Sequence, residues 1–172
     1  MKFNTKTIHG GQEPEETTGA VMPPIFQTST FAQSSPGEHK GYAYARGTNP
    51  TRTALEKSFA AIENGTNGFA FGSGMAAIDC VLRLLKPGDE VIAGDDLYGG
   101  TYRMFTQLFQ KYGLEFSFVN MDIVANVTNS ITEKTKLIWI ETPTNPLMKI
   151  ADIEVISSAV KNKNPEILIA VD

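Results

Sequence analysis

A glycine-rich turn and a strand-ending acid are the residues of this sequence best suited to chemistry. Gly72-Ser73-Gly74-Met75 lies between a short apolar segment and a helical pattern. Glycine lets a ligand approach the backbone, and free N–H groups at a helix start attract anions such as phosphate. Asp172 follows the apolar run Ile167–Val171, which is typical of a buried strand. The turn predicts an anion site and Asp172 a ligand-binding carboxylate, although a ligand-free turn and a surface acid are open alternatives.

Two further loops carry side chains that can bind a flat, polar ligand. Tyr98 follows the strand-like run 90–93 and can stack on a ring, whereas Asn145 follows the run 137–140 and offers an amide. In a parallel sheet the carboxyl ends of the strands share one edge, where α/β enzymes bind their ligands. We therefore expect Tyr98 and Asn145 to meet the glycine-rich turn and the strand-ending acid at that edge.

The same turn also supports a second hypothesis, an NAD-binding domain. Gly72, Gly74 and Ala77 match the relaxed dinucleotide pattern Gly-x-Gly-x-x-Ala, and Asp95 follows about 20 residues later, after the next strand. Asp95 and Asp96 are also a conceivable Mg²⁺ pair, and Asp96 serves equally well as a helix cap. These alternatives stay open at the level of the residues alone.

Residues 1–50 differ from the rest of the chain because they are rich in Gly, Pro, Thr, Ser and Gln and lack a sustained period. Their aromatic residues, Phe26, Phe31, Tyr42 and Tyr44 among them, exceed what a solvated tail usually contains. We expect an arm that packs on another surface, such as a second subunit. Arg46 offers a bidentate grip on phosphate, with a solvated surface position as the alternative.

From residue 50 onward the pattern predicts strands that alternate with helices. Helices are expected from residue 50 to 62, 75 to 85, 102 to 112, 123 to 130 and 153 to 160, and strands over 69–71, 90–93, 115–119, 137–140 and 167–171. This alternation indicates an α/β fold with a mostly parallel sheet and helices on both faces. We expect an N-terminal arm over 1–50 and an incomplete large domain over 51–172, with Cys80 buried and inert in its helix.

Composition excludes several functional classes. The formal net charge of −4 argues against nucleic-acid binding, and scattered Lys and Arg argue against a polybasic membrane patch. A single cysteine excludes an internal disulfide and fits a reducing compartment. No apolar run approaches the ~20 residues that span a bilayer, and the first residues lack the apolar core of a secretory signal. We expect a cytoplasmic protein.

Together these segments resemble the Cys/Met-metabolism family of pyridoxal phosphate enzymes, which includes cystathionine γ-lyase, γ-synthase and β-lyase and methionine γ-lyase. The resemblance is carried by Tyr44-Ala45-Arg46 before Asn49-Pro50-Thr51-Arg52, Gly72-Ser73-Gly74-Met75, Asp96-Leu97-Tyr98-Gly99-Gly100-Thr101, Glu141-Thr142-Pro143-Thr144-Asn145-Pro146 and Val171-Asp172. One departure is Gly47-Thr48, which reverses the family's Ser/Thr-Gly order. The resemblance implies fold type I, that of aspartate aminotransferase, and pyridoxal 5'-phosphate as cofactor.

The resemblance also implies roles for the residues of the sheet edge. The amides of Gly74 and Met75 would hold the cofactor phosphate, and Tyr98 would stack on the pyridine ring. Asp172 would pair with the ring nitrogen and keep it protonated, which makes the ring an electron sink. Tyr98 and Asp172 are therefore expected to be catalytic as well as cofactor-binding.

Four other residues receive roles in the same way. Tyr44 and Arg46 would reach across a subunit interface to the phosphate of the neighbouring site, and Tyr44 is the third catalytic candidate. Asn145 would lie near the ring oxygen or the substrate carboxylate. Arg103 would assist at the substrate end. These assignments imply a homotetramer with shared sites, without a metal.

The expected activity is carbon–sulfur bond cleavage on sulfur amino acids. The resemblance is strongest to cystathionine γ-lyase, which yields cysteine, 2-oxobutanoate and ammonia, with γ-synthase and β-lyase as alternatives. The family binds its cofactor covalently through the lysine of a Ser-x-Thr-Lys segment beyond the position of Asp172, and no lysine here matches that motif. We therefore expect the chain to be part of a larger enzyme and inactive alone. A non-catalytic binding or assembly fragment is the third hypothesis.

Overall fold

The computed structural model describes residues 1–172 and divides into two compact units, Met1–Gly72 and Ser73–Asp172. The predicted arm over residues 1–50 falls in the first unit together with the following helix. The division therefore lies later in the chain than the boundary expected at residue 50. None of the helices has the length and apolar character that a bilayer crossing requires.

The first unit contains two helices, α1 (Phe3–His9) and α2 (Pro50–Ile62). The start of α2 is as predicted, because Pro50 occupies its first turn and the Asn49 side chain accepts a hydrogen bond from the Thr51 N–H. Sequence patterning did not indicate α1. Between the helices the chain is irregular, with one antiparallel bridge that joins Thr30 and Tyr44.

The strand expected over Phe69–Phe71 is absent, so that prediction is wrong. Phe69 is 76% exposed and Phe71 44% exposed. A short apolar run becomes a buried strand only when a neighbouring strand supplies its hydrogen bonds, and here none does. Helix α2 likewise leaves apolar side chains uncovered, since Leu55 and Phe59 are both exposed.

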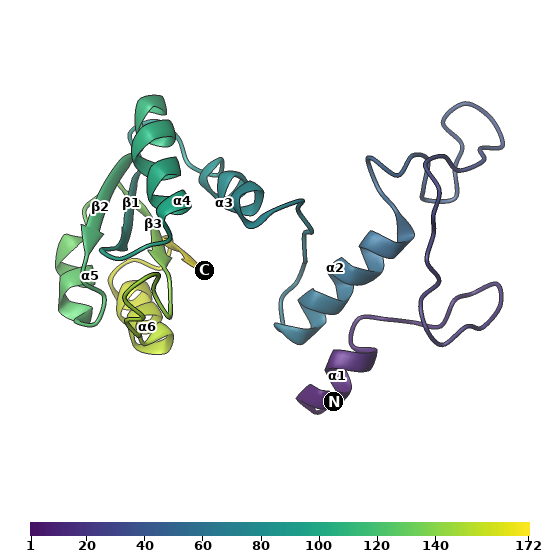
Figure 1. The fold of residues 1–172 in the computed structure, drawn as a ribbon, viewed down its shortest axis with the longest axis horizontal. Helices are drawn as coiled ribbons and strands as arrows, with labels where there is room; N and C mark the ends of the chain where they lie inside the picture. The colour runs from purple at the N-terminus through teal and green to yellow at the C-terminus, as the bar shows by residue number, and fades with distance from the viewer. The chain divides into compact units, whose positions relative to one another are not determined.

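The second unit is built on a parallel sheet of four strands in the order β2-β1-β3-β4 (Figure 1). The strands are β1 (Glu90–Gly94), β2 (Glu115–Val119), β3 (Thr135–Ile140) and β4 (Leu168–Val171). Val91 is paired with Phe116 on one side and with Leu137 on the other. The predicted α/β class with a parallel sheet is confirmed.

Helices cover both faces of this sheet. They are α3 (Gly74–Leu82), α4 (Gly99–Arg103) with its π-helical and 3-10 extensions η1 (Met104–Leu108) and η2 (Phe109–Tyr112), α5 (Val124–Ser130) and α6 (Ile153–Lys163). Figure 1 shows α4 on one side of the strands and α5 and α6 on the other. Cys80 is exposed, which corrects the expected burial. The buried face of α3 contains Ile78 and Leu82, four residues apart, and Cys80 lies between them on another face.

Two apolar layers form the core, one on each face of the sheet. Val91 and Ala93 contribute to the layer under α3, η1 and η2, whereas Ile92 of the same strand contributes to the layer under α5 and α6. Successive strand residues point to opposite faces, and both are apolar because both faces are covered. Burying one such aliphatic side chain contributes about 1.5–3 kcal/mol. The core therefore fixes the strand register and, with it, the loops at the strand ends.

The strand order creates a crevice at the carboxyl edge of the sheet. The chain moves from β1 outward to β2, then returns to place β3 on the other side of β1. The loops that follow β1 and β3 consequently leave the sheet in diverging directions. This topological switch point is where open α/β sheets bind their ligands.

Candidate functional site

A cavity of about 440 Å³ opens at that switch point. It is lined by Ser73, Gly74, Met75, Ile78, Tyr98, Glu141, Pro143, Asn145 and Asp172. The structure thus brings five of the predicted site residues into one cavity, from four separate segments of the chain. The volume falls within the ~300–1,000 Å³ typical of small-molecule sites.

The start of α3 supplies free hydrogen-bond donors. The Ser73 hydroxyl caps the helix by accepting the Ala76 N–H at 3.2 Å, and the Ala77 N–H donates to the Ser73 carbonyl. The amides of Gly74 and Met75 have no acceptor in the chain. No atom lies within 4 Å of where a Cβ on Gly74 would stand, so its backbone is open to a ligand. Two free N–H groups at a helix start suit an anion.

The Tyr98 ring is half exposed and lies against Gly100, which has no side chain and so leaves room for it. It immediately precedes α4 and is 48% exposed. A Cβ on Gly100 would stand 2.4 Å from Cε1 of the Tyr98 ring and 3.0 Å from Sδ of Met75. Only glycine at position 100 therefore lets the ring lie where it does. The arrangement leaves an accessible aromatic face beside the start of α3.

Asp96 connects two loops and does not cap α4, which corrects one of its expected roles. Its carboxylate accepts hydrogen bonds from the Thr144 hydroxyl and from the Leu147 N–H, the latter at 2.9 Å. The residue before α4 is Tyr98, whose side chain makes no capping hydrogen bond. Asp95 is bound by Lys149 Nζ at 2.9 Å. Both acids are therefore already bound by side-chain or backbone groups of the loop after β3.

Asp172 presents a carboxylate without a hydrogen-bonding partner. Its backbone continues the β3–β4 pairing, since its N–H donates to the Ile140 carbonyl at 2.8 Å. Its side chain accepts no hydrogen bond from the protein, and burial raises the pKa of the carboxyl. A negative group held this way favours a cationic or proton-bearing partner on a ligand.

Glu141 is a lining residue that sequence reasoning did not single out. It is buried, and its carboxylate accepts the backbone N–H groups of Tyr98 and Asn145. Burial raises its pKa, the Tyr98 N–H acts in the opposite direction, and the charge of Asp172 raises it further. The available signal was an acid placed directly after the apolar run 137–140.

The cavity is negatively charged, because two carboxylates and no Lys, Arg or His line it. The other predicted residues lie outside its lining. Arg103 is exposed at the end of α4. Tyr44 and Arg46 belong to the first unit, where the Arg46 guanidinium carbon lies 5.0 Å from the centroid of the Tyr44 ring. Their expected roles stay predictions.

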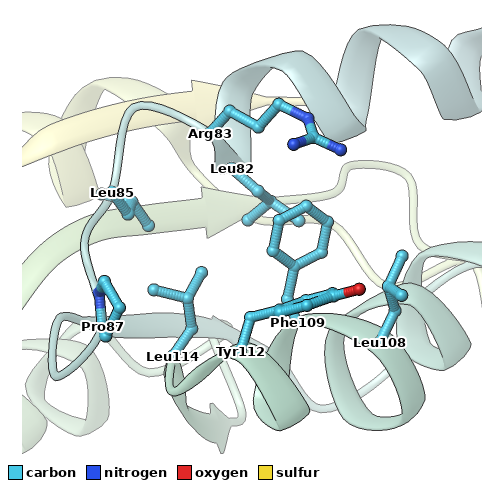
Figure 2. Close-up of a pocket in the computed structure, with 8 residues that line it drawn as sticks. All are labelled: Leu82, Arg83, Leu85, Pro87, Leu108, Phe109, Tyr112 and Leu114. Carbon is cyan, nitrogen blue, oxygen red and sulfur yellow. The ribbon is translucent and has the colours of Figure 1, made fainter.

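A second cavity, of about 560 Å³, lies at the amino edge of the same sheet (Figure 2). Its lining is largely apolar, with Pro87 before β1 and Leu114 before β2 marking its place. Its single charged residue, Arg83, forms a two-pronged pair with Asp79, with nitrogen–oxygen distances of 2.6 and 3.2 Å. This cavity offers no free charged group, so the candidate site is the one at the carboxyl edge.

The carboxyl-edge cavity fits the pyridoxal phosphate that the sequence resemblance implies. Its free amides match a phosphate, the Tyr98 ring matches a flat heterocycle, and the unpartnered carboxylate of Asp172 matches a protonated ring nitrogen. These three features come from different elements and converge on one cavity.

Solved structures with this fold confirm the architecture. The whole chain superposes on a crystal structure of metB from Corynebacterium glutamicum with a TM-score of 0.91 and 44% identity, covering 45% of that chain. It also superposes on cystathionine γ-lyase from Lactobacillus plantarum complexed with L-serine, with a TM-score of 0.90, 44% identity and 44% of that chain covered. The fold type I assignment is confirmed.

Curated relatives point the same way. The chain is 50% identical over 163 residues to a cystathionine β-lyase of Coxiella burnetii, and this match covers 94% of the chain and 42% of the relative. It is 47% identical over 172 residues to a cystathionine γ-lyase of Bacillus subtilis, covering 100% of the chain and 45% of the relative. The chain thus spans less than half the length of these relatives. The model of one family matches residues 4–172, and the chain belongs to that family, the Cys/Met metabolism PLP-dependent enzymes.

Proposed function

We propose that this protein is a pyridoxal phosphate-dependent carbon–sulfur lyase of sulfur amino acid metabolism, acting as a cystathionine γ-lyase. The reaction would convert cystathionine and water to cysteine, 2-oxobutanoate and ammonia. The main support for this proposal is that free amides, an aromatic face and an unpartnered carboxylate meet in one cavity. Cystathionine γ-synthase and β-lyase are the second candidates, since relatives with those names are 50% identical to the chain, against 47% for a γ-lyase.

Three groups of this chain would bind the cofactor. The Gly74 and Met75 amides would donate to its phosphate, and the Tyr98 ring would stack on its pyridine ring. Asp172 would accept a hydrogen bond from the ring nitrogen and keep the proton there. Bound pyridoxal phosphate supplies an electron sink for negative charge at the substrate Cα, and a protonated ring nitrogen strengthens that sink. Tyr98 and Asp172 are the catalytic candidates of this cavity.

Positive charge for the phosphate would come from outside the cavity. Its lining contains two carboxylates and no cation, whereas a phosphate at neutral pH carries ≈ −1.5 to −2 charge. We assign this task to Arg46 with Tyr44, the third catalytic candidate, reaching in from a neighbouring subunit of a homotetramer. Asn145 would lie near the ring oxygen or the substrate carboxylate, and Arg103 would assist at the substrate end. A family lysine outside this sequence would hold the cofactor covalently and move protons.

The proposed location is the cytoplasm, which fits the single, exposed cysteine. An NAD-binding domain is the alternative of a different class. It would leave Tyr98 and Asp172 without a role, and its expected ribose-binding acid, Asp95, is paired with Lys149. A purely assembling fragment would likewise leave the free amides of α3 unexplained.

The full-length protein tests the proposal directly. Pyridoxal phosphate should bind and produce a visible absorbance band, and cystathionine should then release 2-oxobutanoate. Release of pyruvate would instead indicate a β-lyase, and formation of cystathionine from cysteine and an activated homoserine would indicate a γ-synthase. Tight NADH binding without pyridoxal phosphate binding would overturn the proposal.

A further inference from the structure

Glu141 has no part in the function proposed above, yet its carboxylate is bound on two sides within the cavity. The side chain is 7% exposed. Its Oε2 accepts the Tyr98 N–H at 2.9 Å, and its Oε1 accepts the Asn145 N–H at 3.0 Å. One buried carboxylate therefore holds the backbones of two cavity-lining residues that come from different strand ends.

The backbone around Glu141 is fixed to a third strand end. The N–H of Asp172 donates to the Ile140 carbonyl at 2.8 Å, and the Thr142 N–H donates to the Asp172 carbonyl at 3.4 Å. Glu141 lies between these two hydrogen bonds. Its main chain is tied to β4 while its side chain holds the loop after β1, so Glu141 connects the segments that carry Tyr98, Asn145 and Asp172.

Asp96 makes the reverse connection between two of these segments. It belongs to the loop after β1 and accepts hydrogen bonds from the Thr144 hydroxyl and the Leu147 N–H, both in the loop after β3. Glu141 belongs to the loop after β3 and accepts from the loop after β1. Because each loop supplies a buried carboxylate to the other, the two loops are restrained as one body.

This arrangement is costly for a purely structural purpose. Glu141 is buried, and Asp96 and Asp172 are both close enough for their charges to act on it. The charge of Lys149 acts on Asp96, but no Lys, Arg or His lines the cavity beside Glu141 and Asp172. A neutral acceptor would avoid the cost of burying like charges together. A charged acceptor holds N–H donors more strongly than a neutral one does.

We propose that Glu141 is a positioning residue for the cofactor, which sets the separation of Tyr98 and Asn145 so that both meet the pyridine ring at once. The inference rests on the proposed function. Glu141 itself touches the two backbone amides and acts through them. Loss of its carboxylate would therefore let Tyr98 and Asn145 move relative to Asp172, without removing any group that contacts the cofactor.

The test uses the full-length apoprotein titrated with pyridoxal phosphate, comparing wild type, Glu141→Gln and the matched control Glu133→Gln. Glu133 is exposed and its carboxylate makes no hydrogen bond or ion pair in the chain. Glu141→Gln should raise the dissociation constant for pyridoxal phosphate at least about tenfold, which corresponds to about 1.4 kcal/mol of binding free energy. It should also alter the visible circular dichroism of the bound cofactor and speed hydrogen exchange at the Tyr98 and Asn145 amides. Glu133→Gln should match wild type in all three.

Glu141→Asp decides the matter if the glutamine variant fails to fold. It keeps the charge but withdraws the carboxylate by one methylene, so the same weakening is expected. In the wild type, bound pyridoxal phosphate should slow exchange of both amides together, and slowing of only one would overturn the inference. The inference would also be overturned by a Glu141 variant in which the Tyr98 and Asn145 amides exchange faster while the affinity and the circular dichroism stay as in the wild type. That result would show that Glu141 stabilises the loops without positioning the cofactor. Failure of wild type to bind pyridoxal phosphate would overturn the proposed function itself.

Discussion

The two units of the chain differ sharply in how they bury their apolar residues. In the second unit, 73–172, the sheet and its helices enclose every apolar side chain that is buried. In the first unit, 1–72, Gly10 is the only buried residue, and Ile25, Phe59 and Phe69 are largely exposed. Exposed apolar surface of this kind typically marks an interaction site. The second unit is stabilised by its own core, whereas the first leaves much of its apolar surface exposed.

Removing a large apolar side chain should lower the free energy of unfolding much more in the second unit than in the first. Ile138→Ala removes a fully buried side chain from β3 and should lower the free energy of unfolding by about 2–5 kcal/mol. Phe59→Ala, on the exposed face of α2, should change it by less than about 0.5 kcal/mol in the isolated chain. Urea unfolding followed by circular dichroism measures both. Equal losses would show that the first unit has a core of its own.

A glycine pair at the start of α4 tests how the second unit shapes its cavity. Gly100→Ala would drive the Tyr98 ring and the Met75 thioether from their positions, at a cost of about 1–3 kcal/mol. Affinity for pyridoxal phosphate in the full-length protein should fall about tenfold or more. Gly99→Ala is the matched control, since its Cβ would meet only the flexible end of Arg103 at 3.4 Å. Similar affinities for the two variants would contradict the placement of the Tyr98 ring.

The cavity should lower stability near neutral pH when no cofactor is bound. Burial raises the pKa of Asp172 above the usual 3.8, so the folded chain holds this proton more tightly than the unfolded chain does. Its stabilising effect is complete below the unfolded pKa and is lost as pH rises through the folded pKa. Asp172→Asn should therefore raise the melting temperature of the apo chain more at pH 7 than at pH 4. A pH-independent difference would argue against a raised pKa for this carboxyl.

The smallest expected effect lies in the first unit, where the pKa of Glu15 is lowered and not raised as it is for Asp172. Hydrogen bonds, first from the Thr17 N–H and then from Thr18, lower the pKa of Glu15 to about 2. Its contribution is present above the unfolded pKa and is lost as pH falls through about 2. Because the Glu15 carboxylate binds only Thr17 and Thr18, Glu15→Gln should leave the chain's hydrogen-exchange pattern unchanged at pH 7 except at residues 15–18. NMR titration of the Glu15 carboxyl checks the direction of the shift.

The sequence was sufficient to predict the strands of the second unit because they are short, largely apolar segments separated by helical periods. The same rule failed at Phe69–Phe71, where an apolar run has no neighbouring strand. A cap of α4, the usual local role of an acid before a helix, was one alternative for Asp96, but Thr144 and Leu147 bind its carboxylate instead. Local patterns indicate elements and cavity-lining residues, whereas hydrogen bonds between distant loops depend on the assembled sheet.

The role of Glu141 was out of reach for the same reason. Its partner Tyr98 is 43 residues away, and only the strand order brings the two loops together. The residues that meet in the cavity were predictable because each follows a strand and parallel strands share an edge. Tyr44 and Arg46 were also predicted site residues, but they do not line the cavity, and their predicted role depends on a second subunit.

The most direct test of the account is the protonation state of the cofactor's ring nitrogen. Full-length protein loaded with ¹⁵N-labelled pyridoxal phosphate should show, by NMR, a protonated ring nitrogen in the wild type and in the exposed-site control Asp122→Asn. Asp172→Asn should shift that signal to the unprotonated form while the cofactor stays bound. An unprotonated nitrogen in the wild type, or a protonated one in Asp172→Asn, would contradict the assignment of Asp172 and of this cavity.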